Sequence, residues 1–503
     1  MVCLLLILKI KKKKLTKFNI FIPLLILFVL SLPLNLFYQL SEQGSFVNGL
    51  QIDYLIFKIY LIDLVILLLF IAQITTALQK FCWHKSFFQA LQDWFKKLAK
   101  HKPNRFNQPA LIAAVVIVAL IYTQFMIPKP TTILNFALIL GSAILAIVSH
   151  QFSQLSQFSM MVIALLIRQL ITSQPLIAVY FAFNLIVVAL LAGLLYQQRA
   201  VLRSKYISQA IVTSFLVQFI LGIYQFFLQK PLLPYYFLGE PKFEPYYRLS
   251  RYIFNGQEKI LAYASTAHPN ILAAIGTLFF LMIAAKLSLT MSRSQKKLKQ
   301  NIVQLRWLAL LLVLTLILIY ITQAKTALIS LLLGNLIIWQ KQLKLKITTK
   351  TQQVCLGLIL ILIPVLIAIM AQTYHSDPSI TRRHFLNLAA VHMFADKLFL
   401  GQGLNQFTIN LEQFSSSAEI VRFIQPAHHV GLLLLAETGF LGVWFLIISY
   451  RLLHKKIQKQ LIAPLLIISP LLATDHFFYS LQSGRLLLIF FVVYWLSLFN
   501  SKK

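Results

Sequence analysis

Two adjacent histidines, His428 and His429, stand where a long polar loop meets an apolar run. An imidazole at such a boundary is partly shielded from water, and shielding favours the neutral form that can accept a proton. An imidazole of this pair could therefore act as a general base. After nine further residues, Gly439 and Gly442 form a Gly-x-x-Gly element, a spacing that permits close packing of helices in a membrane.

Several charged side chains near the ends of apolar runs could act with these histidines. Asp475 or Glu437 could orient an imidazole, or either could be a structural partner instead. Lys325 begins an apolar run, where its ammonium and the free N–H groups of a helix start would converge on one anion. Alternatively, it only anchors that helix at the membrane surface. Arg382 or Arg383 would add a planar donor fork suited to phosphate.

The sequence gives little sign of metal or redox chemistry. His392 and Asp396 are spaced to share one face of a helix and could chelate an ion, but no second pair with metal-ligand spacing accompanies them. The three cysteines, Cys3, Cys82 and Cys355, are far apart and follow no metal or disulfide pattern. We therefore expect no metal and no other cofactor.

The elements that position these residues are membrane spans. The 503 residues are 59% hydrophobic and only 12% charged, whereas soluble domains have about 45–50% apolar and about 25% charged residues. This composition excludes a soluble globular protein, and apolar runs of about 18–25 residues fit helices that cross a bilayer. We predict an all-α, polytopic transmembrane helical bundle of about 14 spans. The predicted spans are 19–40, 54–78, 110–127, 132–149, 159–172, 175–196, 206–228, 269–288, 307–323, 326–339, 353–371, 429–450, 461–474 and 486–499.

The net charge of +33, from 46 Lys and Arg against 13 Asp and Glu, reflects topology rather than binding of nucleic acid. The basic residues concentrate in alternate loops, and positive charges resist translocation across the membrane. This bias predicts that both termini are cytoplasmic and that the protein lies in the cytoplasmic (inner) membrane. Most acidic residues fall on the opposite, outer side, so we expect a site that faces outward. Membrane lipids are expected partners, and nucleic acid is not.

Three segments outside the spans have recognisable patterns. Residues 82–100 are predicted to form an amphipathic helix on the cytoplasmic side, which either lies on the membrane or packs against the bundle. The outer loops 229–267 and 372–427 are longer than a connection requires, which is typical of functional loops. The second loop has an amphipathic stretch and should fold as a small helical cap. Gly401 and Gly403 within it are interpreted as turn glycines, because Gln406 replaces the third glycine of a dinucleotide loop.

These motifs together resemble the O-antigen ligase and O-antigen polymerase family of membrane glycosyltransferases. His428 leads the family's pattern of His, an amide or hydroxyl residue, nine residues and Gly-x-x-Gly, although His429 replaces the amide or hydroxyl. Four other fragments match in order between about residues 265 and 490: Ala267-His268-Pro269-Asn270 through Ala273, Ala324-Lys325-Thr326-Ala327, Arg382 or Arg383 followed by Leu400 to Phe407, and Asp475-His476-Phe477 through Arg485.

The resemblance implies a GT-C-like fold, with N-terminal transmembrane helices in residues 1–260 and a catalytic region in residues 261–503. It implies transfer of a glycan from a polyprenyl-diphosphate carrier to a hydroxyl of a glycan, lipid or protein acceptor, without metal or nucleotide sugar. His428 would be the base, and Lys325, Arg382 and Arg383 would bind the diphosphate. Lysine at 325 replaces an arginine, and its point charge cannot grip two oxygens in a plane. The supporting residues would be His429, Glu437, Asp475, His268 and Asn270.

Three functions remain open at the level of the sequence. A ligase and a polymerase of lipid-linked repeat units share the pattern and differ in the acceptor. A non-enzymatic flippase or transporter of lipid-linked oligosaccharide would also need many spans and a cationic cavity. Transporters, however, tend to have repeated halves with broken helices near the midplane, and this sequence has no such repeat, so an enzyme is favoured.

Overall fold

The computed structural model describes residues 20–82 and 164–499, except for 43, 167, 244–248, 294–297, 341, 346, 374–377, 416, 418–419 and 421–422. Several sequence predictions therefore lie wholly or partly outside the described residues. These are the amphipathic helix 82–100, the spans 110–127 and 132–149, and part of the span 159–172.

The described chain is mostly helical, and eight of its helices are long and apolar enough to cross a membrane. They are α8 (Pro175–Gln197), α10 (Lys205–Leu228), α12 (Pro269–Arg293), α13 (Leu298–Thr322), α15 (Thr349–Thr373), α19 (Val430–Leu452), α20 (Lys455–Thr474) and α22 (Gln482–Phe499). In three more helices, the apolar stretch that the structure describes is shorter. They are α2 (Phe21–Ser31), α3 (Leu61–Cys82) and α14 (Lys325–Trp339).

The connections carry short helices and strands. The helices are α9 (Arg199–Leu202), α11 (Tyr235–Leu238), α16 (Pro378–Asp396), α17 (Phe407–Phe414), α21 (Phe477–Ser480) and a 3₁₀ turn, η2 (Asp53–Leu55). The strands form three antiparallel pairs: β1 (Phe37–Ser41) with β4 (Phe57–Tyr60), β2 (Phe46–Val47) with β3 (Leu50–Gln51), and β5 (Arg251–Phe254) with β6 (Gln257–Ile260). Because α16 and α17 lie between α15 and α19, the second long loop does contain a helical cap.

The small sheets correct the expectation of a purely helical chain. The predicted spans 19–40 and 54–78 each include a strand, because a short apolar run fits a strand as well as a helix. Lys58, which falls inside the second predicted span, lies in β4 instead, where its ammonium is 3.3 Å from a carboxylate oxygen of Asp53. Asp63 lies in the first turn of α3 and accepts a hydrogen bond of 2.8 Å from the backbone N–H of Tyr60.

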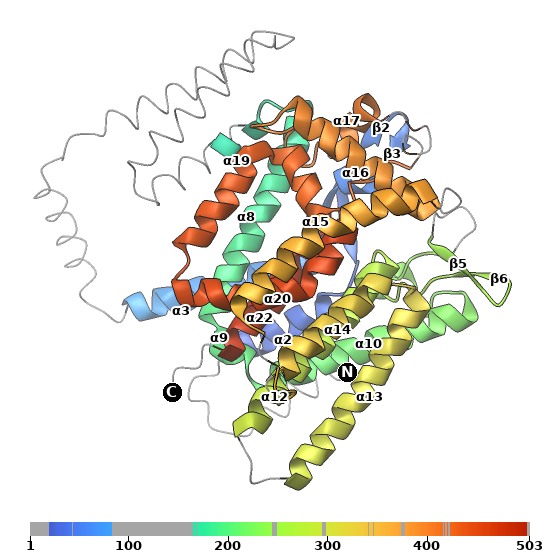
Figure 1. Cartoon of the computed structure of the whole chain (residues 1–503). Helices are drawn as coiled ribbons and strands as arrows, with labels where there is room; N and C mark the ends of the chain where they lie inside the picture. The colour runs from blue at the N-terminus through green and yellow to red at the C-terminus, as the bar shows by residue number, and fades with distance from the viewer. Residues whose placement is uncertain are drawn as a thin grey trace, which may run out of the picture.

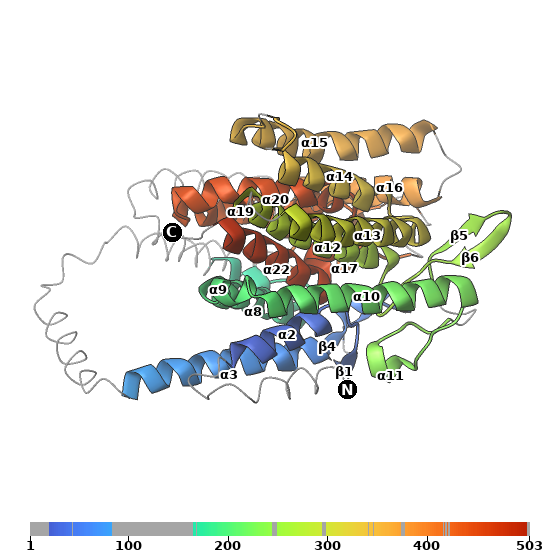
Figure 2. The same cartoon turned by 90° about the horizontal axis from the view of Figure 1, so that it is seen from below.

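The long helices run side by side in one bundle (Figure 1). Helices α12, α14, α19 and α22 begin, and α10, α13, α15 and α20 end, at the same end of the bundle, which we call the loop end. Figure 2 shows α16 and the β5–β6 hairpin together at this end. At the opposite end, the ammonium of Lys286 donates to the backbone carbonyls of Arg203, at 2.8 Å, and of Ser204, at 3.1 Å, and so fixes α12 to the turn before α10.

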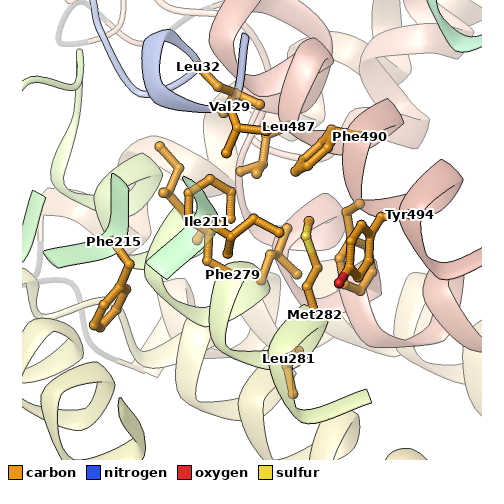
Figure 3. Close-up of a cluster of buried hydrophobic side chains, with 14 of the residues drawn as sticks. Val29, Leu32, Ile211, Phe215, Phe279, Leu281, Met282, Leu487, Phe490 and Tyr494 are labelled. Atoms are coloured by element: carbon orange, nitrogen blue, oxygen red, sulfur yellow. The ribbon is translucent and has the colours of Figure 1, made fainter. Parts of the chain in front are cut away.

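The core of the bundle is apolar and surrounds α12. Figure 3 shows Phe279 and Met282 of α12 beside Ile211 of α10 and Phe490 and Tyr494 of α22, and all five side chains are buried. Between helices in a bilayer, close van der Waals packing rather than transfer from water supplies most of the stabilisation. This packing fixes the start of α12, and with it the polar residues that precede and begin the helix.

Candidate functional site

A polar cluster lies at the loop end, where four segments that are distant in sequence meet. We call it the histidine cluster. Its members come from the start of α12, from α16, from the residue pair before α19 and from the turn after α20, and they are His268, Asn270, Arg383, His428, Asp475 and His476. The sequence predicts most of these as site residues, and the structure brings them together at the ends of the predicted spans.

Asp475 is the buried carboxylate at the centre of the cluster. One of its oxygens accepts a hydrogen bond of 2.7 Å from the amide of Asn270, and the other accepts one of 2.8 Å from the backbone N–H of His476. Burial alone would raise the pKa of Asp475, but the neighbouring histidines and the Asn270 amide outweigh it and hold the pKa below its usual range. Asp475 is therefore a fixed anion.

His428 lies beside this anion. Its Nδ1 is 3.8 Å from a carboxylate oxygen of Asp475, and its Nε2 is 3.3 Å from the side-chain oxygen of Gln425. Burial lowers the pKa of His428 well below its ordinary value; Asp475 opposes this effect, and the charges of His476 and Arg383 add to it. The imidazole is thus neutral near pH 7, which is the form that accepts a proton.

The other two histidines of the cluster are held by hydrogen bonds. His476 has its ring centroid 5.1 Å from that of His428, and its Nδ1 is 2.6 Å from the hydroxyl of Ser480. Burial lowers the pKa of His476 to about 4. The Nδ1 of His268 accepts a hydrogen bond of 3.1 Å from the backbone N–H of Asn270. Burial also lowers the pKa of His268, an effect that Asp475 opposes.

The three predicted diphosphate ligands lie in different surroundings. The charge of Arg383 lowers the pKa of three cluster histidines, so its guanidinium is within electrostatic range of the cluster. Arg382, its neighbour on α16, lies over the ring of Phe423 with 4.5 Å to the centroid. Lys325 is exposed at the first residue of α14. Among the described residues, the charge of Arg383 acts on the three cluster histidines, whereas Lys325 has no such effect on them.

His429 has a structural environment that differs from that of His428. Its Nδ1 accepts a hydrogen bond of 3.0 Å from the backbone N–H of Leu432, and its Nε2 donates one of 3.0 Å to the carbonyl of Leu360 in α15. The imidazole therefore caps the start of α19, which is the task that an amide or hydroxyl side chain usually performs at this position. It also ties α19 to α15.

Glu437 lies within α19, and its hydrogen-bond partners are not the histidines of the cluster. Its carboxylate accepts hydrogen bonds from the hydroxyl of Tyr479, at 2.6 Å, and from the backbone N–H groups of Asn405, at 2.8 Å, and Phe407, at 3.3 Å. These bonds hold α21 and the loop before α17 against α19. Of the two carboxylates that the sequence offers as partners for a histidine, Asp475 is the one beside His428.

The Gly-x-x-Gly element has a different role from the predicted helix packing. Gly439 has a φ of 60° and a ψ of −158°, so α19 is kinked at this residue. A Cβ atom there would lie 2.5 Å from the backbone carbonyl carbon of Phe399. Past the kink, the N–H groups of Phe440 and Leu441 donate to the carbonyls of Leu398 and Phe399, at 2.8 and 3.0 Å. Gly439 thus lets the preceding loop bind to the backbone of α19, and the expectation of helix–helix packing was wrong at this position.

The same loop confirms the interpretation of its own glycines. Gly401 and Gly403 have φ values of 60° and 108°, as expected for turn residues. A Cβ atom on Gly401 would lie 2.3 Å from the backbone of Glu437. The guanidinium of Arg168, a residue that lies in the predicted span 159–172, donates to the carbonyl of Gly401 at 2.8 Å. Arg168 therefore secures the loop rather than facing lipid.

The pair His392 and Asp396 bonds to other groups, whereas three different residues come together with the donor set of a metal site. The Nδ1 of His392 is 3.4 Å from the carbonyl of Phe414, and the carboxylate of Asp396 accepts from Gln402 at 3.0 Å. Elsewhere, His428, Asp475 and His476 each offer one ligand atom, and these atoms lie within 4.8 Å of one another.

Some members of this environment were not selected from the sequence. His476 stands next to Asp475 among the outer histidines, and that adjacency is the signal that could have found it. Tyr54, whose ring packs edge-on against His476 at 5.3 Å between centroids, belongs to the N-terminal part of the chain. No pattern in the sequence relates two residues so far apart, and only the fold brings them together.

The sequence matches no profile of a known protein family, and a search of curated proteins finds no significant match. The fold and the hydropathy of its helices establish that this chain is a polytopic helical membrane protein.

Proposed function

We propose that this protein is a membrane glycosyltransferase that moves a glycan from a polyprenyl-diphosphate carrier to an acceptor hydroxyl at the loop end. One observation carries the proposal. A neutral imidazole, His428, lies 3.8 Å from a buried carboxylate, Asp475, where the helices of the bundle end, and the charge of Arg383 acts on that imidazole. A base and a cation at that depth suit a donor whose lipid tail lies in the bilayer and whose diphosphate lies at its surface.

His428 would act as the general base. Asp475 lies on the Nδ1 side of the ring, so the pair can hold a proton on Nδ1. The Nε2 lone pair then becomes available when the acceptor hydroxyl takes the place of the Gln425 oxygen, which is 3.3 Å from Nε2. Nε2 accepts the proton of the acceptor hydroxyl while the hydroxyl oxygen bonds to the anomeric carbon. The bond from that carbon to the diphosphate breaks, and its electron pair remains on the diphosphate oxygen. The distance of 3.8 Å is expected to shorten when substrate binds.

Arg383 would stabilise the charge that develops on the diphosphate. Fixed cations in a site with little water are worth more than in solution, because the surroundings screen them less. Arg383 is the predicted diphosphate ligand whose charge acts on the base. Lys325 and Arg382 remain predicted ligands, and the exposed Lys325 would meet the carrier at the edge of the site.

Asn270 and His268 would be positioning residues. The Asn270 amide holds the carboxylate of Asp475, and the ring of His268 accepts from the Asn270 backbone. His429 and Glu437 would support the site at a greater distance, through the start of α19 and the loop before α17.

The test is a transfer assay with the purified full-length protein in detergent. Polyprenyl-diphosphate glycan, an acceptor and a chelator are mixed with the protein, and the covalent product is measured by mass spectrometry. We expect product with the natural protein, and a rate about 10²–10⁴-fold lower with His428→Ala, while binding of the donor persists. The matched control is His392→Ala, which removes a histidine outside the cluster and should leave the rate unchanged.

Two outcomes would contradict the proposal. Transfer at the natural rate by His428→Ala would remove that residue from the mechanism. Movement of the lipid-linked glycan across a vesicle membrane without any covalent product would favour a flippase or transporter. Where product forms, the accepted substrate separates the remaining alternatives: a second lipid-linked glycan identifies a polymerase, and a lipid core or protein identifies a ligase.

A further inference from the structure

The histidine cluster also has the donor set of a metal site. Two imidazoles and one carboxylate, from His428, His476 and Asp475, offer ligand atoms within 4.8 Å of one another. Imidazole nitrogen and carboxylate oxygen are ligands that Zn²⁺ binds in proteins. Three protein ligands leave the fourth position of a tetrahedral ion open to water.

The surroundings of two of these ligands resemble those of ligands in metal sites. The Nδ1 of His476 is engaged with the Ser480 hydroxyl at 2.6 Å, which leaves Nε2 as the nitrogen that can bind an ion. One oxygen of Asp475 is held by the Asn270 amide at 2.7 Å. Metal-binding imidazoles and carboxylates usually have such outer partners, because the partners fix the orientation of the ligand.

The third ligand has an unsatisfied atom. Within the described part of the chain, the Nδ1 of His428 is buried and has no hydrogen-bond partner. It is 3.8 Å from the oxygen of Asp475. Ligands at about 2.0–2.2 Å from a tetrahedral Zn²⁺ lie roughly 3.4 Å from one another, so this pair would need to approach by less than about 1 Å. The three ligand atoms, which lie within 4.8 Å of one another, would need to approach by at most about 1.4 Å.

We propose that His428, Asp475 and His476 bind one divalent transition-metal ion of the Zn²⁺ type, and that the bound ion inhibits the protein. Binding follows from the donor set alone, whereas inhibition rests on the proposed function. An ion on the Nδ1 of His428 places the ring proton on Nε2. Nε2 then has no lone pair to accept the proton of an acceptor hydroxyl, so the base is blocked.

Metal binding is tested with the purified full-length protein, carrying a purification tag without histidine and stripped with a chelator that is then removed. Zn²⁺ is titrated by calorimetry, Co²⁺ by its visible absorption, and the ligands of bound Zn²⁺ are identified by X-ray absorption. We expect one ion per chain and a shell of nitrogen and oxygen without sulfur. Ser480→Ala should weaken binding about 10–100-fold, and His476→Ala should weaken it further.

The matched control for the titration is again His392→Ala, which should bind the ion as the natural protein does. Elution as a single species and an unchanged melting temperature show that each variant is folded. Absence of binding by the natural protein, equal binding by His476→Ala, or a sulfur ligand would overturn the site.

Inhibition is tested in the transfer assay by adding Zn²⁺ and then excess chelator to the same sample. We expect the rate to fall and to return. Zinc bound at the site without a change in rate would overturn the inhibitory part of the proposal. A protein that makes no product even with chelator, but still binds Zn²⁺ through these residues, would contradict the proposed transfer and leave the metal site intact.

Discussion

At the scale of single residues, the two adjacent histidines have separate tasks. His428 lies beside Asp475, and both of its ring nitrogens are oriented toward polar groups of the site. His429 has both nitrogens engaged with backbone groups, one of which begins α19. A substitution that keeps the cap but removes the imidazole should therefore affect the two positions differently.

We predict that His428→Asn loses transfer and His429→Asn keeps it. An asparagine oxygen at 429 can still cap the helix, so only the bond to Leu360 is lost, at a cost of about 0.5–1.5 kcal/mol. His429→Ala removes the cap as well and should lower the stability further, by about 0.5–2 kcal/mol. Transfer rates and thermal unfolding of the three variants check this. A normal rate for His428→Asn together with a lost rate for His429→Asn would reverse the assignment.

The buried carboxylates of Asp475 and Glu437 allow a second prediction. Asp475→Asn should lower kcat by about 10²–10⁴-fold and leave the KM for the donor nearly unchanged, because the imidazole loses the anion that orients it. Glu437→Gln should instead lower the melting temperature, since Glu437 accepts from the loop before α17 and from Tyr479. Steady-state kinetics and thermal unfolding separate the two effects. A fall in kcat with Glu437→Gln at unchanged stability would show that Glu437 also acts in the chemistry.

The sequence predicted which residues belong to the cluster better than it predicted which of them contact one another. His428, Asp475, His268 and Asn270 each stand at the end of an apolar run, and ends of spans meet at the membrane surface, so their proximity could be anticipated. The sequence could not show whether Arg382 or Arg383 faces the cluster. Adjacent side chains on a helix point about 100° apart, and which of the two faces the cluster depends on how α16 packs.

At the scale of elements, the kink in α19 controls the loop before α17. The helix and the loop approach each other closely because each has a glycine at the contact. The backbone carbonyls of Leu398, Phe399 and Ala436 accept hydrogen bonds that join the loop to α19. Hydropathy locates α19 but does not show the kink, since Gly439 is also compatible with a straight helix. The strands β1 and β4 are a similar case, because their pairing depends on residues about twenty positions apart.

We predict that Gly439→Ala releases this loop. Gly439 has a backbone conformation that other residues adopt at a cost of about 1–3 kcal/mol, and the added Cβ would meet Phe399. Hydrogen exchange of residues 398–403 should become faster. The control is Gly357→Ala in α15, where a Cβ atom would meet nothing within 4 Å. Unchanged exchange in Gly439→Ala would mean that the loop is held mainly by other contacts, such as that of Arg168.

At the scale of the whole molecule, composition and hydropathy predicted a polytopic helical membrane protein, and the eight long helices confirm it. Composition and hydropathy suffice for this prediction because a helix that crosses a bilayer must be apolar and of a set length. The direction in which the bundle crosses the membrane is a separate question. The excess of basic residues in alternate loops predicts that the loop end faces outward.

This orientation can be tested by labelling with a thiol reagent that does not cross membranes. In a background with the native cysteines replaced by serine, Lys325→Cys places a thiol at the loop end and Lys455→Cys places one at the opposite end. We expect the first to react in intact spheroplasts and the second only after the membrane is opened. The reverse pattern would place the histidine cluster on the cytoplasmic side.

The hydrogen bond between Asn270 and Asp475 has a consequence for biosynthesis. The two residues are 205 positions apart in the chain, so the ribosome makes the amide long before the carboxylate that it holds. The centre of the cluster is absent until translation has passed the turn after α20. A chain that stops earlier would insert many of its helices and still lack the anion, so function would be gained in a single late step of synthesis.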